Sequence, residues 1–270
     1  MQKFKLDIER AALNLRNQFK IDSYGIKDIF SIADKMNIYL IRMPLGKDTI
    51  CGFSTVFEGN KVIVSNSSEI LSREIFTIAH EIAHCEYDLE GDEQKIIIDT
   101  EIGSDTDNFI EKRADYFAAV FLLPEEQIRN FIKYELEKEL KEIRALDIIR
   151  MQIEFNASYA SIVLRLYELN FIDSGLKNLL FEERNTKTSK NLFRVMNLND
   201  DLIKPAEVLK VPNKYYEYVF NNYRNGYVIF EKFKEALELV GFNSDEINEF
   251  KESETHDDEE VDLDELLEGF

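Results

Sequence analysis

The sequence predicts an α+β fold that is mainly helical, with one small antiparallel or mixed sheet near the N-terminus. Two observations indicate this class. Three short runs with strand character, IYLIRMP, CGFSTVF and KVIVSN, follow one another between residues 38 and 66. Elsewhere, apolar residues recur at the three- and four-residue spacing of helices. With 270 residues, the chain can bury one large core or two modest ones.

Two helices are expected before the sheet. Residues 3–19 carry an amphipathic pattern, and residues 25–37 predict a second, short helix. The strands are expected at residues 38–44, 51–57 and 61–66. The segment 58–60, Glu-Gly-Asn, predicts a hairpin turn between the last two strands.

A long helix is expected after the sheet. Asn66, with Glu69 three residues later, forms a capping-box pattern, and the helix that it opens is expected to run to about Tyr87. Residues 108–123 predict a further helix that stops before Pro124, because the residue preceding a proline disfavours helical geometry.

The second half of the chain is expected to be almost wholly helical. The pattern holds from residue 125 to 185, and FNASYASIVLRLYELNFI at 155–172 has the outline of a helix-turn-helix. Residues 209–247 predict a small helical hairpin. The last twenty residues are expected to be disordered because of their charge.

The charge of the chain restricts its partners. The net charge is −20, and ten acidic residues with no Lys or Arg lie between Glu252 and Phe270. Such a surface repels phosphate backbones. It therefore argues against direct nucleic-acid binding and favours a basic protein partner.

The expected location is the cytoplasm. The N-terminal residues mix both charge signs and show no secretory signal. The longest apolar run, residues 117–123, is far shorter than the roughly 18 residues of a membrane span. Cys51 and Cys85 are the only cysteines, and both are expected to be buried thiols.

The stretch FTIAHEIAHCEYD, residues 76–88, predicts a hydrolytic metal site. His80 and His84 lie four residues apart in the predicted helix, so their Cβ atoms are about 5–6 Å apart on one face. Two imidazoles placed in this way can bind one metal ion. Glu81 lies about 100° around the helix, where it can reach a water molecule on that ion.

The apolar residues of this helix separate it into two sides. A stripe expected to be buried is formed by Leu71, Ile75, Ile78 and Ile82. Thr77, His80 and His84 share another side, which is expected to face a cleft. The alternative interpretation is that both histidines are surface or helix-capping residues.

The third metal ligand is expected to be a carboxylate, since a catalytic zinc usually has three protein ligands. The only other histidine, His256, lies in the acidic tail and is not expected to bind. Glu111, 27 residues after His84, is the expected ligand. Asp115, one turn later, is expected to accept the free ring N–H of a ligating histidine. The alternative for this pair of carboxylates is a solvated helix face.

Together, REIFTIAHEIAHCEYD and the following EKRADYFAAVFLLP resemble the ImmA/IrrE family of zinc-dependent metallopeptidases. The similarity covers about residues 5–125 and continues more loosely through the helix-turn-helix-like segment. It implies a zincin-like peptidase domain with the metal ligands His80, His84 and Glu111. Glu81 is then the general base, Asp115 orients a ligand, and the ion is Zn²⁺ or Mn²⁺. The spacing of the two carboxylates also resembles the thermolysin-like His-His-Glu site.

The implied reaction is hydrolysis of a peptide bond. The ion lowers the pKa of a water molecule, and Glu81 moves the proton of that water to the leaving amine. Tyr87 or Tyr116 could stabilise the oxyanion, and core packing is the other explanation for both. Strand 61–66 is expected to form the edge of the cleft and to pair with the substrate backbone.

The domain organisation follows from the resemblance and from the patterns described above. The expected parts are a peptidase domain at 1–125, a helix-turn-helix-like segment at 126–185, a C-terminal helical segment at 186–250 and the acidic tail at 251–270. Between Asp147 and Asp173 the net charge is −2, so we expect the helix-turn-helix-like segment to serve packing or partner docking rather than DNA reading. The tail is expected to fold on a partner around Leu263, to mimic the charge of DNA, or only to aid solubility.

The family resemblance implies that the substrate is a helix-turn-helix transcriptional repressor, or a similar regulatory protein, whose cleavage releases stress-response or mobile-element genes. The alternative is a non-catalytic, metal-containing protein that sequesters a regulator or an antitoxin partner. A general degradative protease is disfavoured, because an unregulated protease in the cytoplasm would be toxic.

Overall fold

The computed structural model describes residues 2–89, 96–99, 108–187 and 189–253. They divide into two compact units at Pro212 and Asn213, called unit 1 and unit 2 here. The acidic tail beyond residue 253, including His256 and the segment around Leu263, lies outside the described residues.

Unit 1 contains a four-stranded mixed sheet with the strand order β1-β3-β2-β4. The strands are β1 (Tyr39–Met43), β2 (Gly52–Phe57), β3 (Asn60–Asn66) and β4 (Ile96–Asp99). β3 runs parallel to β1 and antiparallel to β2, which is also antiparallel to β4. The predicted hairpin between β2 and β3 is confirmed, and Gly59 in its turn has φ 77°, a conformation that glycine adopts without strain. The three predicted strands are confirmed; β4 was not predicted.

β3 lies in the interior of the sheet. Its residues Val62–Asn66 pair with β1 on one side, and Asn60–Ser65 pair with β2 on the other. The prediction that strand 61–66 forms the edge of the cleft is therefore wrong, because both rows of its backbone groups are already paired. β1 and β3 pair although β2 lies between them in the sequence, so the apolar pattern of β3 alone did not reveal this pairing.

The first four helices are α1 (Gln2–Gln18), α2 (Ile29–Lys35), α3 (Leu71–Tyr87) and α4 (Phe109–Leu122). Helices α2 and α3 pack against the sheet, and α4 and α1 follow as further layers on α3. The chain continues through α5 (Glu125–Asn130), a π-helical turn (Phe131–Glu135), a 3₁₀ turn (Leu140–Glu142), α6 (Ala145–Phe155), α7 (Tyr159–Glu168), α8 (Ser174–Lys187), α9 (Ser189–Val195) and a second 3₁₀ turn (Asp201–Ile203). The predicted helices at 3–19 and 108–123 are thus confirmed, and the one predicted at 25–37 is shorter.

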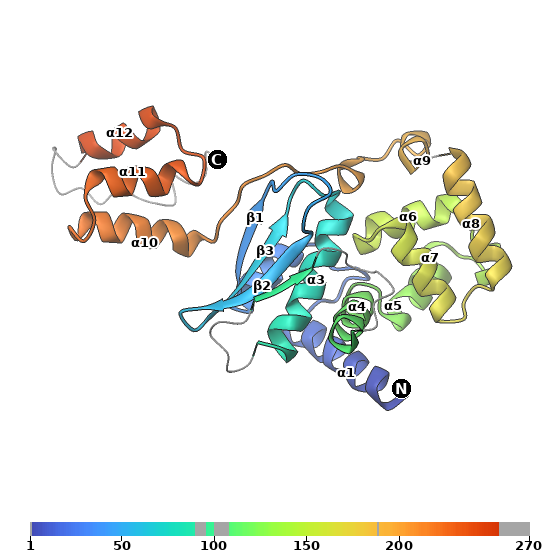
Figure 1. Ribbon diagram of the computed structural model, residues 1–270. Coiled ribbons are helices and arrows are strands. Elements are labelled where there is room, and N and C mark those ends of the chain that lie inside the picture. Colours follow the sequence, from blue (N-terminus) through green and yellow to red (C-terminus); the bar gives the residue numbers. More distant parts are fainter. Residues whose placement is uncertain (1, 90–95, 100–107, 188, 254–270) are drawn as a thin grey trace. The chain divides into compact units, whose positions relative to one another are not determined.

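α3 is the central helix of unit 1. It packs against β2 and β3 on one side and against α4 on the other, and α1 packs against α4 (Figure 1). Ile75, Ile78 and Ile82 lie in the hydrophobic core, as predicted. His80 and His84 are also buried, with 1% and 0% of their surface exposed, so the interpretation as surface histidines is wrong.

The start of α3 differs from the prediction. The helix begins at Leu71 after Ile70, without a side-chain cap. Asn66 instead belongs to β3, and its side chain accepts hydrogen bonds from Leu45 N and Ser68 N at 3.1 and 3.0 Å. The asparagine amide is used to fix the loop after β1, and this leaves it unavailable as a helix cap.

A buried ion pair fixes α3 to the sheet. Glu74 in the first turn of α3 is fully buried and accepts hydrogen bonds from Arg42 of β1 at 2.8 and 2.7 Å. Ser65 of β3 donates to the same carboxylate at 2.8 Å. A bidentate guanidinium–carboxylate pair has a strict geometry. It therefore fixes the direction of the helix that carries the two histidines.

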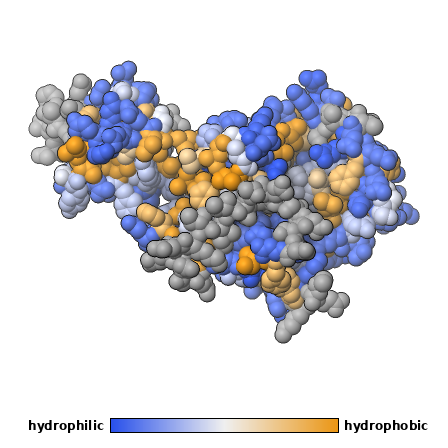
Figure 2. Space-filling model, viewed as in Figure 1, coloured by the Kyte–Doolittle hydropathy of each residue, from blue (hydrophilic) through white to orange (hydrophobic). Residues whose placement is uncertain are grey.

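The helices from α5 to α9 share the hydrophobic core of α1, α3 and α4, which extends from Ile8 to Leu202. α6 and α7 are joined by the turn 156–158, in which Asn156 has φ 51°. On the face seen in Figure 2, hydrophilic residues cover most of the part formed by α6 to α8. The boundaries at residues 125 and 185 remain predictions.

Unit 2 is built from α10 (Asn213–Arg224), α11 (Phe230–Glu238) and α12 (Ser244–Ser253). A small core of Phe220, Phe233, Leu237 and Ile247 holds these helices together. The sequence predicted a helical hairpin over 209–247. The structure has a third helix, α12, that packs with the other two. Among the described residues, no helix in either unit has the length and apolar character needed to cross a membrane.

Candidate active site

The candidate site lies between α3 and α4. Asn108 caps α4 by accepting a hydrogen bond from Ile110 N at 3.0 Å, which sets where the helix begins. Glu111 therefore falls in the first turn of α4, and Asp115 follows one turn later. Because α3 and α4 are packed side by side, these two carboxylates lie opposite the histidines of α3.

Three potential ligand atoms converge on one point. The Nε2 atoms of His80 and His84 are 2.9 Å apart. Oε2 of Glu111 lies 3.2 Å from Nε2 of His80 and 3.5 Å from Nε2 of His84. Among the described residues, this is the one group of His, Cys, Asp or Glu side chains with a geometry that could hold a metal ion.

A carboxylate contacts the far side of each histidine ring. Nδ1 of His80 lies 2.9 Å from Oδ1 of Asp115, and Nδ1 of His84 lies 2.9 Å from Oδ2 of Asp88. Arg113 in turn forms an ion pair with Asp88, whose side chain is 7% exposed. Binding of one ion through both Nε2 atoms requires each ring proton to lie on Nδ1, where a carboxylate oxygen is in place to accept it.

This arrangement fits a metal ion. The two Nε2 lone pairs and the Glu111 carboxylate are all electron donors, and they face each other at 2.9–3.5 Å, where they repel unless a cation lies between them. A tetrahedral zinc site with bonds of about 2.0–2.1 Å separates its donors by roughly 3.3 Å. The observed separations bracket that value.

Glu81 follows His80 directly on α3 and is fully buried. The strand β2 passes close to it at Gly52. A Cβ atom at Gly52 would lie 2.7 Å from Cγ2 of Thr77, 2.8 Å from the carbonyl oxygen of Val64 and 3.7 Å from Oε1 of Glu81. Glycine is required here because any side chain would push β2 away from α3. The carboxylate of Glu81 is thereby held in a desolvated position next to the sheet.

The site is open toward α4. The side chains of Glu111 and Asp115 are 19% and 22% exposed, whereas those of His80 and His84 are 1% and 0% exposed. The histidines thus form the floor of the site, and the carboxylates lie at its mouth.

Among the described residues, neither Tyr87 nor Tyr116 contacts the three potential ligand atoms. The hydroxyl of Tyr116 donates to Glu9, and burial raises the pKa of Tyr116 above its ordinary value. The ring of Tyr87 packs against Phe117 and beneath the guanidinium of Arg113. These contacts agree with the packing role that was the alternative for both tyrosines.

The family comparison is consistent with this geometry. The model of the peptidase M78 family, described as the IrrE N-terminal-like domain, matches residues 33–167, which is half of the 270 residues. The chain belongs to this family. The M78 peptidase described here is accordingly a metal-dependent hydrolase that acts on peptide bonds, and its substrate is a protein or peptide. Among the curated proteins, none matches the chain.

Sequence reasoning missed several residues that shape the site of this M78 peptidase. Asp88 contacts His84, Arg113 pairs with Asp88, and Gly52 lets β2 approach Glu81. Asp88 lies four residues after His84, so the same helical spacing that predicted the histidine pair could have identified it. Arg113 and Gly52 depend on contacts between separate elements and gave no local signal.

Proposed function

We propose that this M78 peptidase is a cytoplasmic zinc endopeptidase, with Mn²⁺ as the other possible ion, that cleaves a helix-turn-helix transcriptional repressor or a similar regulatory protein. His80, His84 and Glu111 hold the ion, and Glu81 is the general base. The observation that carries the proposal is the convergence of three ligand atoms, within 3.5 Å of one another, beside a buried glutamate.

The proton transfers are assigned to Glu81. When bound, the ion supplies a Lewis acid that polarises the scissile carbonyl and lowers the pKa of a water molecule. The Glu81 carboxylate takes a proton from the water as its oxygen adds to the carbonyl carbon. As the carbon–nitrogen bond breaks, Glu81 returns that proton to the nitrogen of the leaving amine.

Asp115 and Asp88 act as positioning residues. Each accepts the Nδ1 proton of one histidine and so keeps the opposite nitrogen free of a proton. Their charge also makes the ring a stronger electron donor. The ion pair with Arg113 holds Asp88 in place.

The charge of the protein supports a basic substrate. A net charge of −20 favours a partner of opposite sign, and DNA-binding repressors are generally basic. The helix-turn-helix-like segment of the peptidase itself is poorly suited to reading DNA. Of the two arginines between Asp147 and Asp173, Arg165 is 3% exposed and is engaged by Glu168 and by the carbonyl oxygen of Leu123. We therefore assign this segment to packing or to docking of a protein partner.

The proposal is tested by incubating the purified peptidase with a helix-turn-helix repressor encoded beside it and following intact mass. Cleavage that stops on addition of a chelator and resumes with Zn²⁺ is expected. Glu81→Gln should slow cleavage by about 10²–10⁴-fold while metal content is unchanged. Glu86→Gln, on the same helix but 41% exposed, is the matched control and should cleave normally.

The possible outcomes separate the parts of the proposal. Full cleavage by Glu81→Gln contradicts the assignment of the base. An intact repressor beside a cleaved unrelated peptide contradicts the substrate class but not the peptidase activity. If Glu81→Gln releases the target genes in cells as well as the wild type does, the chain acts by sequestering its partner instead.

A further inference from the structure

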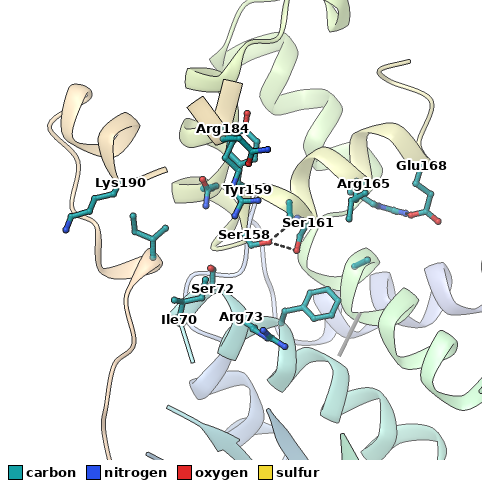
Figure 3. Close-up of a pocket in the computed structure, with 17 residues that line it drawn as sticks. Ile70, Ser72, Arg73, Ser158, Tyr159, Ser161, Arg165, Glu168, Arg184 and Lys190 are labelled. Carbon is teal, nitrogen blue, oxygen red and sulfur yellow. Dashed lines mark hydrogen bonds and ion pairs between the residues drawn. The ribbon is translucent and has the colours of Figure 1, made fainter. Parts of the chain in front are cut away.

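A large pocket lies away from the candidate metal centre, within unit 1. Its volume is about 980 Å³, and it is enclosed by the beginning of α3 and by α4, α6, α7, α8, α9 and the last 3₁₀ turn (Figure 3). Ser72 and Arg73 come from α3, Ser158 and Tyr159 from the start of α7, and Arg184 from α8. None of these residues belongs to the metal site.

The pocket is positively charged in a strongly acidic chain. Arg73, Arg184 and Lys190 line it, and Figure 3 shows them on three different sides of the space. Arg73 also forms an ion pair with Glu69, at 3.7 Å. Among the described residues, neither Arg184 nor Lys190 forms an ion pair; the guanidinium of Arg184 lies only over the ring of Tyr159, at 5.8 Å. A fourth cation, Arg165, is neutralised by Glu168 at 2.7 Å. An excess of positive charge therefore remains.

Two buried polar atoms in the pocket wall have no hydrogen-bond partner. Oγ of Ser72 and Oε1 of Gln152 are both unpartnered, and each residue is 1% exposed. In Figure 3 the Ser72 hydroxyl lies on the side of the residue that faces Ser158 and Tyr159. Leaving such groups unsatisfied is costly, so a molecule in the pocket that forms hydrogen bonds with them would gain stability.

The start of α7 adds further donors. Ser158 caps this ten-residue helix by accepting a hydrogen bond from Ser161 N at 3.0 Å, and the two serine hydroxyls are 2.8 Å apart. The positive end of the helix dipole therefore points at the pocket. Apolar side chains, among them Phe76 and Leu164, form another part of the wall, to which Asn185 and Glu168 also contribute.

We propose that this pocket binds a small organic anion whose negative group lies near Arg184, Lys190 and the start of α7, and whose apolar body lies against Phe76 and Leu164. Ser72 and Gln152 supply the remaining hydrogen bonds. The size is appropriate, since pockets for small molecules usually enclose about 300–1,000 Å³. This binding site goes beyond the proposed function and does not depend on peptidase activity.

The proposal is tested on the full chain by fluorescence titration with 8-anilinonaphthalene-1-sulfonate, an anion with an apolar aromatic body. Saturable binding is expected, and inorganic phosphate should compete for the anionic part of the site. Arg184→Met/Lys190→Met should weaken binding by about tenfold or more. Arg129→Met/Lys133→Met makes the same change of charge outside the pocket and is expected to bind as the wild type does.

A second pair of variants tests the buried hydroxyl without removing charge. Ser72→Ala should weaken binding of the probe severalfold and leave the melting temperature unchanged or higher, because an unsatisfied group is removed. Ser54→Ala removes an equally buried and unpartnered hydroxyl in β2, outside the pocket, and should not change binding.

Equal affinity of the pocket variants and their controls, in folded protein, would overturn the proposal. Non-saturable binding of the probe to the wild type would do the same. Glu81→Gln should bind the probe normally, so failure of the peptidase mechanism and failure of this binding site give different results.

Discussion

The Nε2 atoms of His80 and His84 lie 2.9 Å apart, and each ring is held on its other side by a carboxylate. Two such lone pairs approach each other without a penalty only when a cation neutralises them. The surrounding fold maintains this geometry: the Arg42–Glu74 ion pair orients α3, and the cap at Asn108 places Glu111 opposite. The candidate site is therefore organised by residues distant in the sequence.

Asp88→Ala is expected to lower the affinity for zinc by about 10–100-fold, because His84 loses the acceptor that fixes its ring and its tautomer. The affinity can be measured by competition with a chromophoric chelator. Asp115→Ala should have a similar effect through His80. Asp7→Ala, an exposed change in α1, is the control and should bind zinc normally. An unchanged affinity in Asp88→Ala contradicts the positioning role.

Gly52→Ala is expected to destabilise the peptidase by about 1–3 kcal/mol, because the added methyl group overlaps with Thr77 and Val64. The free energy of unfolding is measured by urea titration. Gly175→Ala is the control: its new Cβ would meet only Asp173 Oδ1, at 3.3 Å, and alanine favours a helix. If both variants are equally stable, the close approach of β2 to α3 is not required.

The contacts of Glu168 predict that the folded protein loses stability in acid. Burial alone would raise its pKa, but hydrogen bonds from Lys5 and Arg165 outweigh burial and lower the pKa below its ordinary value. A lowered pKa in the folded state adds stability above the unfolded-state pKa of about 4.3, and this contribution disappears as the pH falls through the folded-state value.

Glu168→Gln should therefore be less stable than the wild type at pH 7, by about 1 kcal/mol because solvent screens this partly exposed pair, and the difference should shrink below about pH 4. Urea titrations across this pH range measure it. Glu126→Gln, an exposed change in α5, should match the wild type throughout. A difference that stays constant with pH would show that the charge of Glu168 is not responsible.

Cys85 is expected to be unreactive in the folded protein. It is fully buried, and burial raises the pKa of its thiol to about 12. At pH 8 only about one thiol in 10⁴ is then ionised, and the thiolate is the reactive form. Labelling with a thiol reagent, followed by peptide mass mapping, should modify Cys85 only in denaturant. Rapid labelling of the native protein contradicts this.

Local features were predicted well from the sequence. The placement of His80 and His84 on one face follows from helix geometry alone. The structure places Glu111 beside both histidines and Asp115 beside His80, as expected. Charged residues are abundant in this chain, so the choice of Glu111 relied on the preceding histidine pair and on the family resemblance.

Non-local features were not predictable. The position of β3 inside the sheet depends on β1, and the role of Asn66 depends on the loop after β1. The third helix of unit 2, α12, was not predicted because its ten residues form a highly charged segment at the end of the predicted hairpin. For β3 and Asn66, a contact between separate elements decided the outcome.

The metal content of the purified full-length peptidase tests the central claim most directly. Elemental analysis after dialysis against zinc should find about one ion per folded chain. Glu111→Gln should lose most of it, while Glu125→Gln, an exposed change in the neighbouring helix α5, should retain it. A well-folded wild type that takes up no divalent ion, or a Glu111→Gln variant that binds zinc as tightly as the wild type, contradicts the proposed site.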